Sequence, residues 1–227
     1  MSAGQLPVAA PSGTWPMFRA MVGVGLACGL IIVSAYLGTK PRIEHNRAEA
    51  LAAAIYDVLP GAVSSATFRW QEGAGFAPLT AESGGDARVH AGYDAEGRLV
   101  GVAIEAAGMG YQDVIHVLWG YSITEEAIVG LKVLESRETP GLGDRIEHDP
   151  ALLENFRRLD VSLTDDGQAL RHDVAAVKHG TKTNPWEIDS ITGATISSKA
   201  IGSLLDASAS VWAPRIQSGH ESLEVKP

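Results

Sequence analysis

The sequence predicts an α+β domain with a mainly antiparallel sheet and flanking helices, preceded by one N-terminal transmembrane helix. Three observations lead to this prediction. Residues 20–39 contain no charged side chain. Four strand-like runs follow one another between residues 88 and 135. An apolar stripe at helical spacing then occupies residues 196–212.

The uncharged segment is long enough to cross a membrane. Its twenty residues, at the helical rise, span about 30 Å, the thickness of the hydrocarbon core. Arg19 precedes it and Lys40 follows it. Trp15 and Tyr36 lie near its two ends, where aromatic rings favour the membrane interface. We therefore predict a transmembrane helix over 17–40, behind a flexible tail over residues 1–16 that is rich in Pro, Gly and Ala.

Two other interpretations of this segment stay open. A cleavable signal peptide would end at Val33-Ser34-Ala35, where the residues are small. The apolar run continues past that point, which favours an uncleaved anchor. A lipoprotein site at Cys28 requires a branched residue three positions earlier, and Gly25 stands there.

Positive charge is denser after the segment than before it, so the positive-inside rule by itself predicts a cytoplasmic domain.

The remaining elements follow from periodicity and turn residues. Residues 41–59 have a helical apolar stripe that Pro60-Gly61 ends, and residues 71–85 read as a loop, so 41–86 is predicted as a linker helix and loop. The predicted strands are 88–93 and 98–106, which flank a turn at residues 94–97, then 114–121, 128–135 and 174–178. Helices are predicted over 150–158 and 196–212. Pro214 is expected to end the last helix, which leaves a domain over 87–213 and a C-terminal tail over 214–227.

Composition excludes several classes of function. The net charge of −9 argues against a nucleic-acid partner, because phosphates require a basic surface. One cysteine cannot form an internal disulfide, an iron–sulfur cluster or a haem-attachment motif. The seven histidines form no short-spaced metal-ligand pair, and the sequence contains no nucleophile elbow or credible catalytic triad. We therefore expect no metal ligands and no catalytic residues.

The run Asp189-Ser-Ile-Thr-Gly-Ala-Thr195 stands directly before the last predicted helix. Small residues and glycine let the backbone approach a bulky ligand, and a helix N-terminus suits a phosphate group. This run is therefore a candidate phosphate-binding loop. The alternative is that Thr195 only caps the helix, as Ser and Thr often do.

A second candidate is Ser136-Arg-Glu-Thr-Pro-Gly-Leu-Gly143. Pro140 and Gly141 predict a type II turn, and Gly141 and Gly143 would leave the backbone open to contact a flat ring. The alternative is a turn that ends a strand and binds nothing. Neither this run nor Gly108-Met-Gly110 matches a dinucleotide fingerprint, so no Rossmann unit is predicted.

Together these motifs resemble the G subunit of the Rnf electron-transport complex and, more distantly, the C subunit of the sodium-pumping NADH:quinone reductase. The resemblance covers nearly the whole chain, and the order of the 138–143 and 189–195 motifs is its most specific part. The resemblance implies that FMN is joined by a phosphoester to Thr195 and that a separate flavin transferase forms this bond. It assigns Asp189, Thr192, Gly193 and Ala194 to transferase recognition and the phosphate pocket.

The same resemblance implies the rest of the site and the function. Glu138, Thr139, Gly141 and Leu142 would lie against the isoalloxazine. Lys178 would contact the phosphate or the ring, although His179 replaces a usual glycine beside it. The chain would be an electron-relay subunit and not a stand-alone enzyme, in a complex that couples electron transfer between ferredoxin and NAD to ion translocation.

The family also implies partners and a location. The partners would be other membrane and peripheral subunits of the complex. The location would be the bacterial inner membrane, crossed once, with the soluble domain in the periplasm, which is opposite to the orientation that the Lys/Arg count predicts. The alternative function is a membrane-tethered ligand-binding, scaffold or regulatory module without redox activity.

Overall fold

The computed structural model describes residues 13–79 and 87–224, in two units divided between Glu49 and Ala50. Helix α1 (Thr14–Val58) runs through this division. It contains a window of 18 residues with a mean hydropathy of 2.2, none of which is buried. By length and composition, α1 can cross a membrane.

Two expectations about this region are corrected. The predicted transmembrane and linker helices are one continuous helix, with Pro41 inside it. Proline removes a single N–H donor, and the helix continues on both sides of it. The helix begins at Thr14, so residues 14–16 of the predicted tail are helical. Residues 1–12 of that tail lie outside the described residues.

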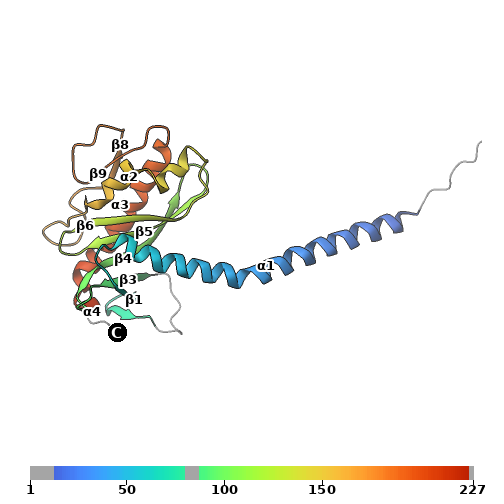
Figure 1. The fold of residues 1–227 in the computed structure, drawn as a ribbon, viewed down its shortest axis with the longest axis horizontal. Helices are drawn as coiled ribbons and strands as arrows, with labels where there is room; N and C mark the ends of the chain where they lie inside the picture. Colours follow the sequence, from blue (N-terminus) through green and yellow to red (C-terminus); the bar gives the residue numbers. More distant parts are fainter. Residues whose placement is uncertain (1–12, 80–86, 225–227) are drawn as a thin grey trace, which may run out of the picture. The chain divides into compact units, whose positions relative to one another are not determined.

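The second unit combines a mainly antiparallel sheet with flanking helices, as the sequence predicts, and adds a small second sheet (Figure 1). Its strands are β1 (Ser64–Gln71), β2 (Gly75–Pro78), β3 (Arg88–Tyr93), β4 (Leu99–Met109), β5 (Val114–Ser122), β6 (Ala127–Glu135), β7 (Leu159–Asp160), β8 (Ala175–Val177) and β9 (Glu187–Asp189). Its helices are η1 (Gly143–Glu147), α2 (Pro150–Glu154), η2 (Asn155–Arg157), α3 (Thr195–Gly219) and α4 (Glu221–Glu224), where η denotes a 3-10 helix.

The main sheet is antiparallel throughout, in the order β2-β1-β3-β4-β5-β6-β7. The predicted hairpin is confirmed, because the Asp94 N–H donates to Arg98 O at 3.0 Å across the β3–β4 turn. Strands β1 and β2 precede residue 87, where the predicted domain starts, and β2 lies inside the segment predicted as a loop. The rest of that loop, residues 80–86, lies outside the described residues.

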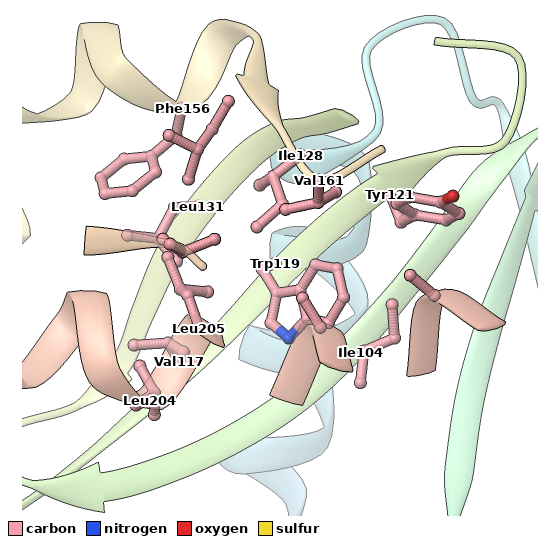
Figure 2. Close-up of a cluster of buried hydrophobic side chains, with 14 of the residues drawn as sticks. Ile104, Val117, Trp119, Tyr121, Ile128, Leu131, Phe156, Val161, Leu204 and Leu205 are labelled. Carbon is pink, nitrogen blue, oxygen red and sulfur yellow. The ribbon is translucent and has the colours of Figure 1, made fainter. Parts of the chain in front are cut away.

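Helix α3 packs on one face of this sheet. Alternate residues of the central strands point to that face, including Val102 and Ile104 of β4 and Val117 and Trp119 of β5. Figure 2 shows Val117 beside Leu204 and Leu205 of α3, with Trp119 in the same cluster. The Trp119 indole N–H donates a hydrogen bond to the Ser208 hydroxyl at 3.1 Å.

Helix α3 passes through Pro214, where the sequence predicts its end, and continues to Gly219, after which α4 follows. Ala213 and Ile216, on either side of this proline, are fully buried in the core. Burial of apolar side chains offsets the loss of one helical hydrogen bond. The Arg215 guanidinium, which lies 5.8 Å from the Trp70 ring centre and 5.4 Å from the Trp212 ring centre, also fixes this end of the helix.

The end of α1 packs on the opposite face, where glycines give it room. Gly92, Gly101, Gly120 and Gly130 stand on β3, β4, β5 and β6, and each would place an added Cβ against Val58 or Leu59. At Gly120 such an atom would lie 2.1 Å from the Val58 carbonyl oxygen. The absence of these four side chains therefore allows the helix to reach the sheet.

The second sheet positions the candidate site. Strands β8 and β9 pair in parallel, which agrees with the predicted strand over 174–178 but adds a partner that the sequence pattern does not predict. Helix α2 and η2 occupy most of the helix predicted over 150–158. Strand β9 ends at Asp189, the first residue of the candidate phosphate-binding loop.

Candidate functional site

Thr195 is the first residue of α3, and its side chain is exposed. The N-cap position is occupied by Ala194, with no side-chain capping hydrogen bond. The alternative that Thr195 caps the helix is therefore wrong. Within the described part of the chain, the Thr195 hydroxyl has no hydrogen-bond partner, so it is accessible for chemistry.

The backbone around Thr195 suits an anion. The Ser198 N–H donates to Ala194 O at 2.9 Å and closes the first turn of α3. The N–H groups of Thr195, Ile196 and Ser197 find no acceptor among residues 13–79 and 87–224. Unpaired N–H groups form the positive end of a helix and bind phosphate groups. An exposed hydroxyl and a helix end that suits an anion therefore meet at one residue.

The loop before α3 is held by its own hydrogen bonds. Gly193 has a φ of 89°, which favours glycine, and it completes a turn in which the Ala194 N–H donates to Ile191 O at 3.1 Å. The Ser198 hydroxyl accepts from the Ile191 N–H at 3.1 Å and donates to Ala194 O at 2.9 Å. These bonds fix the direction in which the chain enters the helix.

The predicted turn over residues 139–142 is confirmed. The Leu142 N–H donates to Thr139 O at 3.1 Å, and Gly141 has a φ of 77°, as the third residue of a type II turn requires. The Thr139 hydroxyl donates to the Gln112 side-chain oxygen at 3.1 Å, which ties the turn to the β4–β5 connection. Leu142 has 53% of its surface exposed, an apolar side chain available to a ligand.

Glu138 points into the protein. It is 5% exposed, and its carboxylate accepts hydrogen bonds from the Gln112 N–H at 2.9 Å and from the Ser197 hydroxyl. Burial raises the pKa of Glu138, but these hydrogen bonds outweigh it and hold the pKa below its usual value. Gly143 is buried against Glu138 and Ser197, so the lack of a side chain at Gly143 makes room for the contact between these two residues.

A third loop approaches the same region. Residues 178–181 form a turn in which the Thr181 N–H donates to Lys178 O at 3.0 Å and Gly180 has a φ of 76°. The Lys178 side chain is exposed. Asp189 joins this turn to the loop before α3, because its carboxylate accepts from the Gly180 N–H at 2.7 Å and lies 3.3 Å from His179 Nδ1.

A pocket of about 250 Å³ adjoins the loop before α3 and the 178–181 turn, and it is lined by Arg145, Asp149, His179, Asp189 and Thr192 among others. Arg145 donates to Thr192 O at 3.0 Å and to the Asp149 carboxylate at 2.6 Å. Burial raises the pKa of Asp149, but the Arg145 guanidinium and two backbone N–H groups outweigh it and lower that pKa. The lining of the pocket is mixed: Arg145 and His179 contribute polar side chains, and Leu152 and Ile191 contribute apolar ones.

An open groove of about 450 Å³ is lined by the end of β4 and by α3. Met109 and Ile196 line it, with 71% and 57% of their surfaces exposed, and Lys199 stands among them. The loop that precedes Thr195 therefore lines a mixed pocket, and the helix that begins at Thr195 lines a largely apolar groove.

The structure brings the predicted residues together on three connected loops. Glu138 joins the 138–143 turn to α3, and Asp189 joins the 178–181 turn to the loop before α3. Sequence reasoning missed two residues that support them, Arg145 and Asn155. Asn155 accepts from the Asp189 N–H and from Lys182 Nζ, each at 3.0 Å. Neither stands in a recognisable motif, so no local signal pointed to them.

Comparison with known proteins assigns the chain to a family. Residues 110–209 match the FMN-binding domain, and this region contains all ten predicted site residues. The chain is 31% identical over 179 residues to the G subunit of the ion-translocating oxidoreductase complex of Pseudoalteromonas atlantica, and the match covers 78% of this chain and 77% of that relative. This chain belongs to the family of G subunits of ion-translocating oxidoreductase complexes. The resemblance found in the sequence is thereby confirmed.

The chain is also similar to a second G subunit and to one solved structure. The G subunit of the Na(+)-translocating ferredoxin:NAD(+) oxidoreductase complex of Acetobacterium woodii is 32% identical over 117 residues, 51% of each chain. The crystal structure of the C subunit of Na(+)-translocating NADH-quinone reductase from Parabacteroides distasonis has a TM-score of 0.56 at 18% identity, over 82% of this chain and 98% of that chain. This likeness confirms the predicted fold class.

Proposed function

We propose that this chain carries FMN, joined through its phosphate to the Thr195 hydroxyl, and relays electrons within a membrane complex. The complex would couple electron transfer between ferredoxin and NAD to ion translocation, the activity that the name of the Acetobacterium woodii relative states. The observation that carries the proposal is the exposed Thr195 hydroxyl beside three N–H groups at the start of α3 that have no acceptor in the described part of the chain.

The chemistry of this helix end fits a phosphodiester. FMN esterified to a hydroxyl retains about one negative charge on its phosphate, and the positive end of a helix stabilises such a charge. Lys178 is an exposed cation on a neighbouring loop, and Thr192, Gly193 and Ala194 form the turn that leads into the helix. These residues would hold the phosphate, and Asp189 would fix the loop through Gly180.

Other predicted residues would hold the ring. The exposed Leu142 and the backbone of Gly141 offer an apolar and unobstructed surface, and Thr139 fixes the turn that presents them. When bound, FMN supplies one- and two-electron redox chemistry, while the protein orients it and sets its electrostatic surroundings. The tether would keep the carrier at a high local concentration.

Attachment would require a separate flavin transferase. The Thr195 oxygen would form a bond to the flavin-side phosphorus of a flavin dinucleotide, and the bond to the nucleotide monophosphate leaving group would break. The Thr195 proton would pass to a base of the transferase. The transferase would recognise Asp189, Thr192, Gly193 and Ala194, whose loop ends at the exposed hydroxyl.

Helix α1 determines how the chain would be attached to the membrane. Helix α1 would anchor the chain once in a bacterial inner membrane, with the domain in the periplasm and beside other subunits of the complex. The length and composition of α1 support the anchor. The resemblance to the family implies a periplasmic domain, whereas Lys40, Arg42 and Arg47 after the span favour a cytoplasmic domain.

The test is co-production of the full chain with a flavin transferase, followed by denaturing electrophoresis. The wild-type band should retain flavin fluorescence, and Thr195→Ala should abolish it. The matched control is Thr183→Ala, which removes a threonine outside the attachment loop and should leave the band fluorescent. A colourless wild-type band would reject the proposal in favour of a scaffold or ligand-binding module without redox activity.

A further inference from the structure

Glu138 is the only buried carboxylate among the described residues. Burial of an unpaired carboxylate is strongly unfavourable, so its surroundings must stabilise the charge. One oxygen accepts from the Gln112 N–H at 2.9 Å and the other from the Ser197 hydroxyl. The backbone of Tyr111 and Asp113 also stabilises the ionised form. The carboxylate therefore binds the β4–β5 connection on one side and α3 on the other.

Two glycines make room for this carboxylate. A Cβ added at Gly110 would lie 2.5 Å from Glu138 Oε1, and one added at Gly143 would lie 2.5 Å from Oε2. Either atom would push the carboxylate out of its position. Both glycines belong to motifs that carry the family resemblance. In the structure, the lack of a side chain at each of them leaves space for the Glu138 carboxylate.

The position of the charge matters because Ser197 lies in the first turn of α3, two residues after Thr195. A negative charge there interacts favourably with the positive end of the helix. It also partly cancels the positive potential that this end offers to a bound anion or to an electron-accepting group. A buried charge is screened less by water and salt than an exposed one.

We propose that Glu138 is a positioning residue that fixes the two glycine-containing loops against the attachment turn and, through its charge, lowers the reduction potential of FMN carried at Thr195. This inference rests on the proposed function. Addition of an electron to the flavin is opposed by a nearby fixed negative charge, and the opposition is greatest where the dielectric constant is low. Without Glu138, the flavin would be easier to reduce.

The test separates the charge from the hydrogen bonds. Glu138→Gln keeps the shape and removes the charge, whereas Ser197→Ala removes one hydrogen bond and keeps the charge. The full chain, co-produced with a flavin transferase, is titrated to obtain the midpoint potential of its flavin. The potential should rise in Glu138→Gln and should not rise in Ser197→Ala, while loosening of the turn alone would move both variants together.

Each outcome decides the inference. An unchanged potential in flavin-loaded Glu138→Gln, or an equal rise in both variants, would overturn it. If Glu138→Gln does not accumulate, Glu138→Asp answers the same question: it keeps the charge but is too short to reach both partners, so its thermal midpoint should fall without a rise in potential. A rise in that variant would overturn the inference. Absence of flavin from the wild-type chain would instead reject the proposed function.

Discussion

The Arg145 guanidinium donates a hydrogen bond to the carbonyl oxygen of Thr192 at 3.0 Å. This bond joins η1, which begins at the last residue of the 138–143 motif, to the loop that ends at Thr195. The second branch of the guanidinium forms an ion pair with Asp149, the N-cap of α2. Arg145 therefore connects three segments around the pocket, although it belongs to no predicted motif.

Replacement of Arg145 by alanine should lower both stability and flavin attachment. The change leaves Asp149 without its cationic partner and Thr192 O without its donor, which should cost about 1–2 kcal/mol of unfolding free energy. The fraction of chain that carries flavin should fall several-fold, because the attachment loop loses a fixed contact. Urea unfolding and fluorescence of denatured protein measure the two effects. The control is Arg137→Ala, since Arg137 makes exposed ion pairs; an equal loss there would contradict the role of Arg145.

Replacement of Gly120 by alanine should destabilise the packing of α1 on the sheet. The added Cβ would lie 2.1 Å from the Val58 carbonyl oxygen, which is backbone and cannot rotate away. Overpacking of this kind costs about 1–3 kcal/mol. Gly97→Ala is the comparison, because an added Cβ there meets open space and only the positive φ imposes a cost, about 1 kcal/mol. Equal unfolding free energies in the two variants would contradict the packing argument.

Glu187 should contribute to the loss of stability in acid. Hydrogen bonds from the Thr183 and Asn184 N–H groups and from the Asn184 side chain lower its pKa from 4.5 to about 2. A lowered folded-state pKa gives stability that is complete above the unfolded-state pKa and is lost as the pH falls through the folded-state pKa. Glu187→Gln should therefore lose less stability than wild type between about pH 5 and about pH 2. Parallel pH profiles for the two proteins would contradict this assignment.

The orientation of the domain can be measured with a single cysteine. Cys28 is the only cysteine in the chain, so Cys28→Ser combined with Glu147→Cys leaves one thiol, at an exposed position of the domain. A membrane-impermeant maleimide should label this thiol in intact bacterial cells if the domain is periplasmic. Labelling only after the membrane is disrupted would contradict the proposed side and support the Lys/Arg count.

Local sequence patterns predicted much of this fold. The Asp94–Gly97 turn, the strands around it and the 139–142 turn each depend on neighbouring residues, and the structure contains all of them. Strand β8 was predicted, but its parallel partner β9 was not, because a three-residue strand shows no alternation that a sequence can reveal. The continuation of α3 past Pro214 depends on burial of Ala213 and Ile216, which only the assembled core determines.

The candidate site likewise has parts that local sequence patterns predict and parts that they do not. The Gly193 turn and the start of α3 could be predicted, because glycine and hydroxyl residues mark them locally. The contact of Glu138 with Ser197 joins residues 59 positions apart, so its sequence neighbours gave no sign that the side chain is buried. Asn155 and Arg145 were missed for the same reason: the partners that connect them to the loop before α3 come from distant segments of the chain.

The most direct test of the central claim is intact-mass measurement of the denatured full chain after co-production with a flavin transferase, followed by fragmentation to locate any added group. The account predicts a mass increase of one FMN less one water, assigned to Thr195 and absent from Thr195→Ala. An unmodified wild-type mass, or FMN located on a different residue, would contradict it.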